Sequence, residues 1–196
     1  GRSYYTDALK SLIDAYLADH PEIDTDRIYV GGCSNGGYMT VNMIVEFPEF
    51  FAAAYPVCEA YDAAWLTDEM VESIKDLPVW LTAAKNDGTV VIFEGESDPA
   101  NYMVYNLKLD EDGSPIPKAN FSNDLYDRLV KAGAKDVHYS LFDDVHDTTG
   151  LYKGADGKPY QYMGHWSWIY TLNDQCVETI DGQETTLFQW LAQQSR

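Results

Sequence analysis

The chain has 196 residues, a length that suits one large domain or two small ones. Its composition is 45% hydrophobic and 14% aromatic, which excludes a disordered chain and supplies material for a buried core. Thirteen basic against 32 acidic residues give a net charge of −19, so we expect neither nucleic acid nor an anionic membrane surface as a partner.

Hydrophobic periodicity and turn residues predict helices that alternate with strands. Helices are predicted over residues 6–19, 35–47, 67–75, 121–134 and 185–194, and strands over residues 27–30, 51–57, 77–83 and 137–142. Such alternation is typical of a mostly parallel sheet with helices on both faces, a three-layer α/β/α fold. We find no linker that marks a second domain, so residues 1–196 are expected to form one domain.

The cysteines and apolar segments exclude several other classes of protein. Cys33, Cys58 and Cys176 form no CxxC pair and no close Cys/His cluster, so we expect no structural zinc, no other metal and no cofactor. No apolar run reaches the roughly 20 residues that a membrane-spanning helix needs.

One segment carries a catalytic motif. It is a G-x-S-x-G sequence formed by Gly32, Cys33, Ser34, Asn35 and Gly36. A predicted strand precedes it and a predicted helix follows, which is the context of a nucleophile elbow. The sharp turn would hold Ser34 in strained backbone geometry, and small neighbours would make room for it. The backbone N–H of Asn35 is then expected to contribute to an oxyanion hole. The alternatives are a helix cap formed by Ser34 and a phosphate loop, which lacks its Lys-Ser/Thr end.

A serine nucleophile needs a base and a carboxylate that orients the base. Asp87 follows the predicted strand over residues 77–83, at the strand end where such sheets place their sites. Asn86-Asp87-Gly88 is also a favoured turn sequence, and the two roles are compatible.

Two histidines compete for the role of the base. His146 directly follows the last predicted strand of the sheet, which favours it by position. His165 follows a glycine and has tryptophans on its C-terminal side, which favours it by its surroundings. The residues alone leave both open.

Three segments resemble a known family. They are Asp24–Gly37 with the serine motif, Leu77–Val90 with Asp87, and Gly164-His165-Trp166-Ser167-Trp168. Together they resemble the α/β-hydrolase esterases, and most closely the polyhydroxybutyrate-depolymerase-like and feruloyl-esterase-like branch near the prolyl-oligopeptidase-like group. The resemblance implies an α/β-hydrolase fold and a catalytic triad of Ser34, Asp87 and His165, with His146 as the alternative base.

The sequence departs from that family in two places. Residues 147–163 make the interval before His165 longer than expected, and only 33 residues precede Ser34. The family places its nucleophile after about the fifth strand of eight, so we expect this chain to be the C-terminal portion of the fold, from before the nucleophile elbow. The strand over residues 27–30 would then have an exposed edge. The missing N-terminal part or another copy of the chain is expected to cover it.

Within this resemblance, the cysteines and aromatic residues gain roles. Cys58 and Cys176 are both expected near the site, and we predict a disulfide between them, which implies an oxidising compartment and a secreted or extracytoplasmic protein. Tyr38, Tyr162, Trp166 and Trp168 are expected to form an aromatic platform for an acyl group or a sugar, with core packing as the alternative.

Three functions follow from these expectations. The first is a serine esterase that acts on small-molecule or polysaccharide-linked carboxylic esters, including aryl esters. The second is a serine peptidase of the prolyl-oligopeptidase-like type, which would use the same triad. The third is an inactive fragment or binding module of the same fold.

Overall fold

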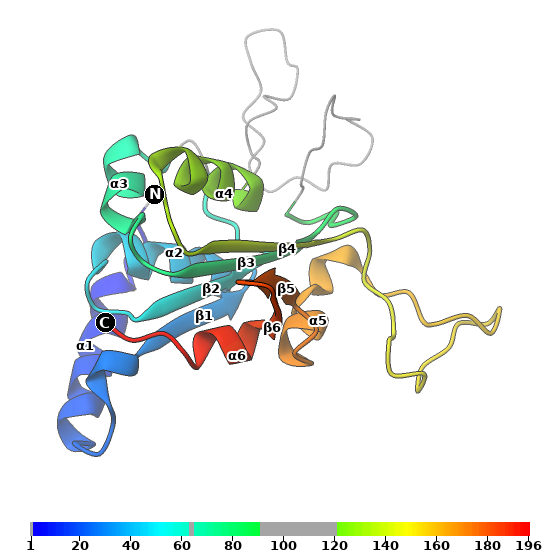
Figure 1. Ribbon diagram of the computed structural model, residues 1–196, viewed down its shortest axis with the longest axis horizontal. Helices are drawn as coiled ribbons and strands as arrows, with labels where there is room; N and C mark the ends of the chain where they lie inside the picture. Colours follow the sequence, from blue (N-terminus) through cyan, green and yellow to red (C-terminus); the bar gives the residue numbers. More distant parts are fainter. Residues whose placement is uncertain (1, 63–64, 91–120) are drawn as a thin grey trace, which may run out of the picture.

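A four-stranded parallel sheet forms the centre of the molecule. The computed structural model describes residues 2–62, 65–90 and 121–196. The strands are β1 (Tyr29–Cys33), β2 (Ala53–Val57), β3 (Val79–Ala84) and β4 (Val137–Phe142). They pair in the order β1-β2-β3-β4, so β1 and β4 are the edges of this sheet (Figure 1). Because all four strands are parallel, their carboxyl ends lie at the same end of the sheet, and the loops that follow the strands meet there.

Helices cover both faces of this sheet. They are α1 (Thr6–Asp19), α2 (Asn35–Glu46), α3 (Asp68–Ile74), α4 (Phe121–Ala132), α5 (Trp168–Leu172) and α6 (Leu187–Leu191), with short 3-10 turns η1 (Thr25–Arg27) and η4 (Gly164–Trp166). Residues of α2, α3 and α4 share one buried cluster with the sheet, and α6 packs on the opposite face (Figure 1). The predicted three-layer α/β/α arrangement is confirmed.

The most buried strand is β3, whose six residues are all buried. Leu81 points into the cluster under α2–α4, whereas Trp80 packs in the cluster under α6. A strand that is covered on both faces reads as a continuous apolar run, which is why its sequence shows no alternation.

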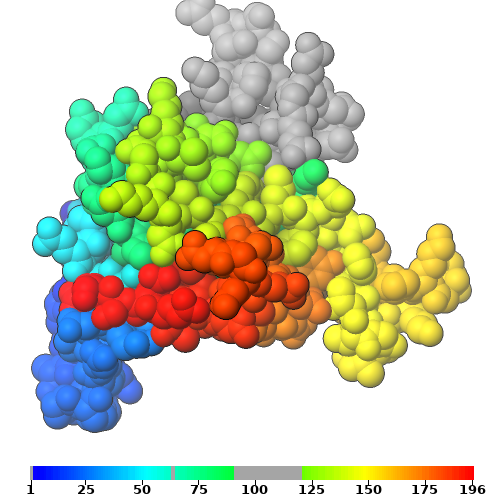
Figure 2. Space-filling model, viewed as in Figure 1, coloured from blue at the N-terminus to red at the C-terminus, as the bar shows by residue number. Residues whose placement is uncertain are grey.

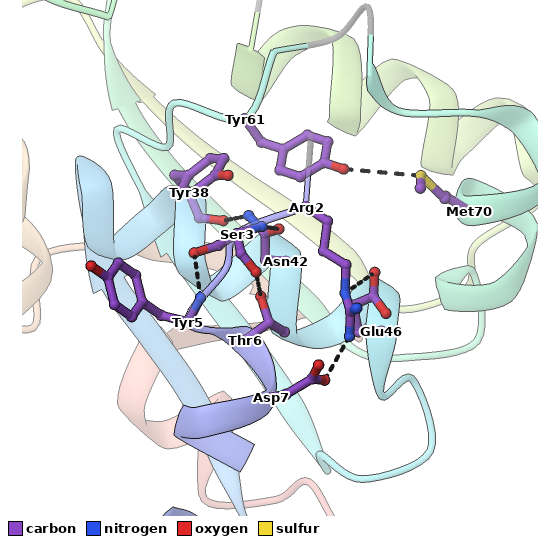
Figure 3. A network of polar contacts seen from close by, with 10 residues as sticks. All are labelled: Arg2, Ser3, Tyr5, Thr6, Asp7, Tyr38, Asn42, Glu46, Tyr61 and Met70. Atoms are coloured by element: carbon purple, nitrogen blue, oxygen red, sulfur yellow. Dashed lines mark hydrogen bonds and ion pairs between the residues drawn. The ribbon is translucent and has the colours of Figure 1, made fainter. Parts of the chain in front are cut away.

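The N-terminal segment is fastened to α2 rather than left free. The backbone N–H of Ser3 donates to Asn42 Oδ1 at 2.9 Å, and the Arg2 guanidinium pairs with Glu46 at 3.0 Å and with Asp7 at 2.6 Å (Figure 3). These contacts set α1 against α2, the helix that begins at the serine motif.

The end of the chain differs from the prediction. Instead of one helix over residues 185–194, it forms an antiparallel hairpin, β5 (Val177–Ile180) and β6 (Gln183–Thr186), followed by α6. Asp181 and Gly182 have φ values of 50° and 79°, which is the backbone of a tight hairpin turn. Thr186 then caps α6, because its side chain accepts from the backbone N–H of Gln189.

The serine motif forms a strained turn between β1 and α2. Ser34 has φ 58° and ψ −115°, a backbone conformation that residues with a Cβ rarely adopt. The turn brings Gly32 against the start of α2, since a Cβ on Gly32 would lie 2.7 Å from the carbonyl of Gly36. A Cβ on Gly36 would meet nothing within 4 Å. The steric demand for a glycine therefore falls on Gly32.

A charged histidine ties the terminal hairpin to the main sheet. His138 on β4 hydrogen-bonds Asp136 through Nε2 and Glu178 of β5 through Nδ1, both at 2.8 Å. Burial alone would lower the pKa of His138, but the hydrogen bonds and charges of the two carboxylates outweigh it and raise the pKa to about 9. The Trp190 indole also donates to Asp136 at 2.8 Å, which joins α6 to the same group.

Across the part of the chain that the structure describes, no helix combines the length and apolar character that crossing a membrane requires.

We predict that this histidine makes stability depend on pH. Its folded pKa of about 9 lies above the ordinary 6.5, so its contribution is complete below about pH 6.5 and is lost as the pH rises through about 9. The shift corresponds to at most about 3 kcal/mol. In urea denaturation, the wild-type free energy of unfolding should fall more between about pH 6.5 and about pH 9.5 than that of His138→Gln. Equal pH dependence in the two proteins would contradict this role, and His146→Gln serves as the matched control.

We also predict that the two glycines of the motif respond differently to alanine. Gly32→Ala forces a methyl group against the Gly36 carbonyl and should lower the free energy of unfolding by about 1–3 kcal/mol. Gly36→Ala meets open space inside a helix and should leave stability unchanged or raise it by up to about 1 kcal/mol. Urea denaturation of the two variants measures the difference, and similar losses in both would refute the asymmetry.

Candidate active site

Ser34 stands at the carboxyl end of β1, directly before α2. Its backbone N–H donates to the Val57 carbonyl at 2.9 Å, which ties the turn to the end of β2. Its side chain makes no capping hydrogen bond to α2. The structure therefore does not use Ser34 as a side-chain cap, and the hydroxyl is available for another partner.

Asp87 lies in the loop after β3 and is only 2% exposed. Its backbone N–H donates to the Ala84 carbonyl at 3.1 Å, which closes the predicted turn. One carboxylate oxygen, Oδ1, accepts from the backbone N–H groups of Thr89 at 2.7 Å and Val90 at 2.9 Å. These contacts fix the carboxylate and leave Oδ2 for a third group.

His165 supplies that third group. Its Nδ1 lies 2.8 Å from Asp87 Oδ2, and its Nε2 lies 2.9 Å from Ser34 Oγ. The ring sits in η4 and is 8% exposed. Gly164 lets the backbone approach closely, because a Cβ there would collide with Asn86. The structure thus brings Ser34, Asp87 and His165 into one hydrogen-bonded chain.

His146, the alternative base, makes different contacts. Its Nδ1 lies 2.6 Å from Asp144 and 3.2 Å from the Tyr170 hydroxyl, and its side chain is 43% exposed. His146 directly precedes residues 147–163 in the chain and does not contact Ser34 or Asp87 in the contacts described above. The geometry thus separates two histidines that the residues alone left equivalent.

The arm, defined here as residues 147–163, projects from the body of the molecule (Figure 2). It is closed at its base, where the backbone N–H of Asp147 donates to the Tyr160 carbonyl and that of Tyr162 to the Val145 carbonyl, both at 2.8 Å. The chain therefore returns to nearly the point at which it left, directly before His165.

Aromatic rings adjoin the histidine on one side. Trp168 packs its edge on the His165 ring with centroids 5.4 Å apart, and Trp166 lies 6.2 Å from Trp168. Trp166 is 39% exposed and also contacts Tyr162 at 6.1 Å. These three rings form a row that starts at the site.

Tyr38 belongs to a different group of aromatic residues. It lies one turn into α2 and stacks on Tyr61 with centroids 5.7 Å apart (Figure 3). Tyr61 in turn meets Trp65, which is 40% exposed. The described rings therefore do not form the single platform that the sequence suggested.

The predicted disulfide between Cys58 and Cys176 is wrong, because all three cysteines are free. Cys176 is packed under α6, where its sulfur lies 3.4 Å from the Thr82 hydroxyl. Cys58 follows β2 and has its sulfur within 4.8 Å of the site atoms of Asp87 and His165. Burial raises the pKa of Cys58 to about 12, so its thiol is neutral. The sequence argument for an oxidising compartment loses its basis.

Asn35 is the first residue of α2, so its backbone N–H has no acceptor within the helix. It lies beside Ser34 at the positive end of the helix dipole. This is the position that an oxyanion-hole donor requires.

Comparisons with known proteins bear on the fold and the class of protein. The model of the prolyl oligopeptidase family matches residues 4–98, just under half of the chain. Poly(3-hydroxyalkanoate) depolymerase C of Paucimonas lemoignei is 40% identical over 50 residues, which cover 26% of this chain and 12% of that protein.

Solved structures extend the likeness to nearly the whole chain. A thermostable esterase aligns with a TM-score of 0.58 and 29% identity over 97% of this chain and 37% of its own. The acylaminoacyl peptidase of Pyrococcus horikoshii aligns with a TM-score of 0.51 and 16% identity over 86% of this chain and 26% of its own, a likeness of fold alone. The chain thus spans well under half the length of these proteins. It has the α/β-hydrolase fold in its esterase-like form.

Proposed function

We propose that this chain carries the active site of a serine hydrolase that cleaves carboxylic esters. The observation that carries the proposal is the position of His165, which hydrogen-bonds Ser34 at 2.9 Å and Asp87 at 2.8 Å. The nucleophile Ser34, the orienting acid Asp87 and the base His165 follow one another in the chain order of elbow enzymes. The third function, an inactive or binding module, would be favoured by a serine far from both histidines, which is not the geometry observed.

The geometry supports an acyl-enzyme mechanism. Ser34 Oγ attacks the ester carbonyl while His165 Nε2 takes its proton and then gives it to the leaving alcohol. Water then attacks the acyl-enzyme while His165 Nε2 takes its proton, and the acid is released as Ser34 Oγ regains a proton from His165. Asp87 accepts from Nδ1–H, which keeps Nε2 free as a base and stabilises the imidazolium that forms. The Asn35 N–H stabilises the developing oxyanion.

The surroundings of the site support an ester with an aryl or sugar part. Trp166 and Trp168 offer flat apolar faces beside His165. The net charge of −19 favours neutral or cationic substrates over anionic ones. By their names, the thermostable esterase acts on esters and the depolymerase acts on poly(3-hydroxyalkanoate).

A serine peptidase is the second candidate. The match of residues 4–98 to the prolyl oligopeptidase family favours it, and the same three residues would serve. An amide has a poorer leaving group than an ester, so amide cleavage depends more strongly on proton donation to the leaving group by His165.

The edge strand β1 has one unpaired side in the described sheet, which needs a partner. In the described sheet β1 pairs only with β2. We propose that a further part of the same fold or another copy of the chain pairs with its free edge, since an unpaired strand invites association.

The first test is labelling with a fluorophosphonate, followed by peptide mapping. We expect the modified residue to be Ser34, because its hydroxyl lies 2.9 Å from Nε2 of His165, the base of the proposed triad. Ser34→Ala should abolish labelling, and His165→Ala and Asp87→Asn should slow it by about 10³-fold or more.

The matched control is His146→Gln, which removes the other candidate base and should label like wild type. Labelling that is lost in His146→Gln and kept in His165→Ala would overturn the assignment of the base.

The second test separates the two substrate classes. We expect measurable kcat/KM with aryl and acetyl esters and no turnover of N-acylated aminoacyl amides. Both are to be measured on the same protein and on Ser34→Ala. Comparable turnover of the amides would favour the peptidase.

A further inference from the structure

A thiol lies within the group of atoms that forms the proposed triad. The Cys58 sulfur, a carboxylate oxygen of Asp87 and a ring nitrogen of His165 all lie within 4.8 Å of one another. All three residues are buried, with exposures of 1% for Cys58, 2% for Asp87 and 8% for His165. Sulfur, imidazole nitrogen and carboxylate oxygen are the three ligand types that zinc prefers in proteins.

The spacing suits a zinc ion after a small adjustment. Bond lengths of about 2.0–2.3 Å in a tetrahedral site hold the donor atoms about 3.3–3.6 Å apart. The His165–Asp87 contact of 2.8 Å would therefore open by about half an ångström, and the sulfur would move inward by about an ångström or less.

A fourth donor atom, the Ser167 hydroxyl oxygen, lies beside the Cys58 thiol. Ser167 is fully buried, and its hydroxyl oxygen has no nitrogen or oxygen hydrogen-bond partner among the described residues. Its polar neighbour is the Cys58 thiol, toward which it acts as a hydrogen-bond donor. Because sulfur is a weak acceptor, a metal ion or its bound water would give this buried hydroxyl a stronger partner.

We propose that Cys58, Asp87 and His165 form an inhibitory binding site for Zn²⁺, with the Ser167 hydroxyl or a water as the fourth ligand. The proposal rests on the triad of the proposed function, but binding of the metal does not require turnover.

The chemistry accounts for inhibition. Zn²⁺ bonds to the Cys58 sulfur and His165 Nδ1, and the thiol proton and the Nδ1 proton leave. Nε2 takes up one proton, so the ring stays neutral and one proton per zinc ion is released to solvent. The resulting Nε2–H donates to Ser34 Oγ and cannot accept its proton. The serine therefore loses its base while the fold is retained.

The test uses Co²⁺ as a probe for the zinc site, because a cobalt–thiolate bond gives a charge-transfer absorption band. We expect one equivalent of Co²⁺ to produce this band in wild-type protein and in Ser34→Ala, and Zn²⁺ to displace it. Cys58→Ser should lose the band and weaken Zn²⁺ binding by at least about 10-fold in calorimetry.

Cys33→Ser is the matched control, since it removes the other thiol next to Ser34, and it should retain the band. His165→Ala should also raise the dissociation constant at least about 10-fold, which tests the site if Cys58→Ser does not fold. No band in folded wild-type protein, or a band that survives in Cys58→Ser, overturns the proposal.

Measurements on Ser34→Ala and on chelator-treated wild-type protein separate this proposal from the proposed function. Cobalt binding to Ser34→Ala tests the metal site without any catalysis. Fluorophosphonate labelling of chelator-treated protein tests the triad without any metal. If both hold, added Zn²⁺ should suppress labelling of Ser34 and a chelator should restore it.

Discussion

The imidazole of His165 is the group on which the candidate site depends. Its two nitrogens join Ser34 after β1 and Asp87 after β3, so one ring spans the end of β2, the strand between them. Parallel strands make this possible, because the residues that follow them lie at the same end of the sheet. Cys58 directly follows that intervening strand, and its sulfur lies within 4.8 Å of the site atoms of His165 and Asp87.

The segment that carries His165 is held at both ends. His165 itself is held by its hydrogen bonds to Ser34 and Asp87. The hairpin and α6, which follow it in the chain, are joined to β4 and to the residue before it through His138 and Trp190. Trp80 on β3 lies under this junction and contacts both the His138 ring and Trp190. The short terminal elements would have little stability alone, so their position is set by these contacts with the sheet.

Features that depend on local sequence were predictable. The strand–turn–helix around Ser34 follows from the motif, β4 follows from its alternation, and the turn at Asp87 follows from its tripeptide. The terminal hairpin was missed because its strands are polar, although Asp181-Gly182 is a hairpin signal. The N-terminal helix was predicted with its correct bounds, although two of its large apolar residues, Leu12 and Tyr16, are 66% and 56% exposed.

Features that depend on long-range placement could not be predicted from local sequence patterns. The residues alone did not decide between His146 and His165, because the choice depends on the path of the intervening chain, which has little periodicity; the family resemblance favoured His165. The disulfide prediction failed because Cys176 follows the His165 segment in the chain but does not lie beside the site in space. Cys176 lies under α6 instead, among Trp80, Leu187 and Trp190.

The closed base of the arm has a consequence for how the protein can change. Because backbone hydrogen bonds join Val145 to Tyr162 and Asp147 to Tyr160, the distance between the ends of the arm does not depend on its length. Insertions or deletions beyond this base can then accumulate without displacing His165. The arm is therefore the natural place for evolution or engineering to graft a new recognition loop beside an unaltered candidate site.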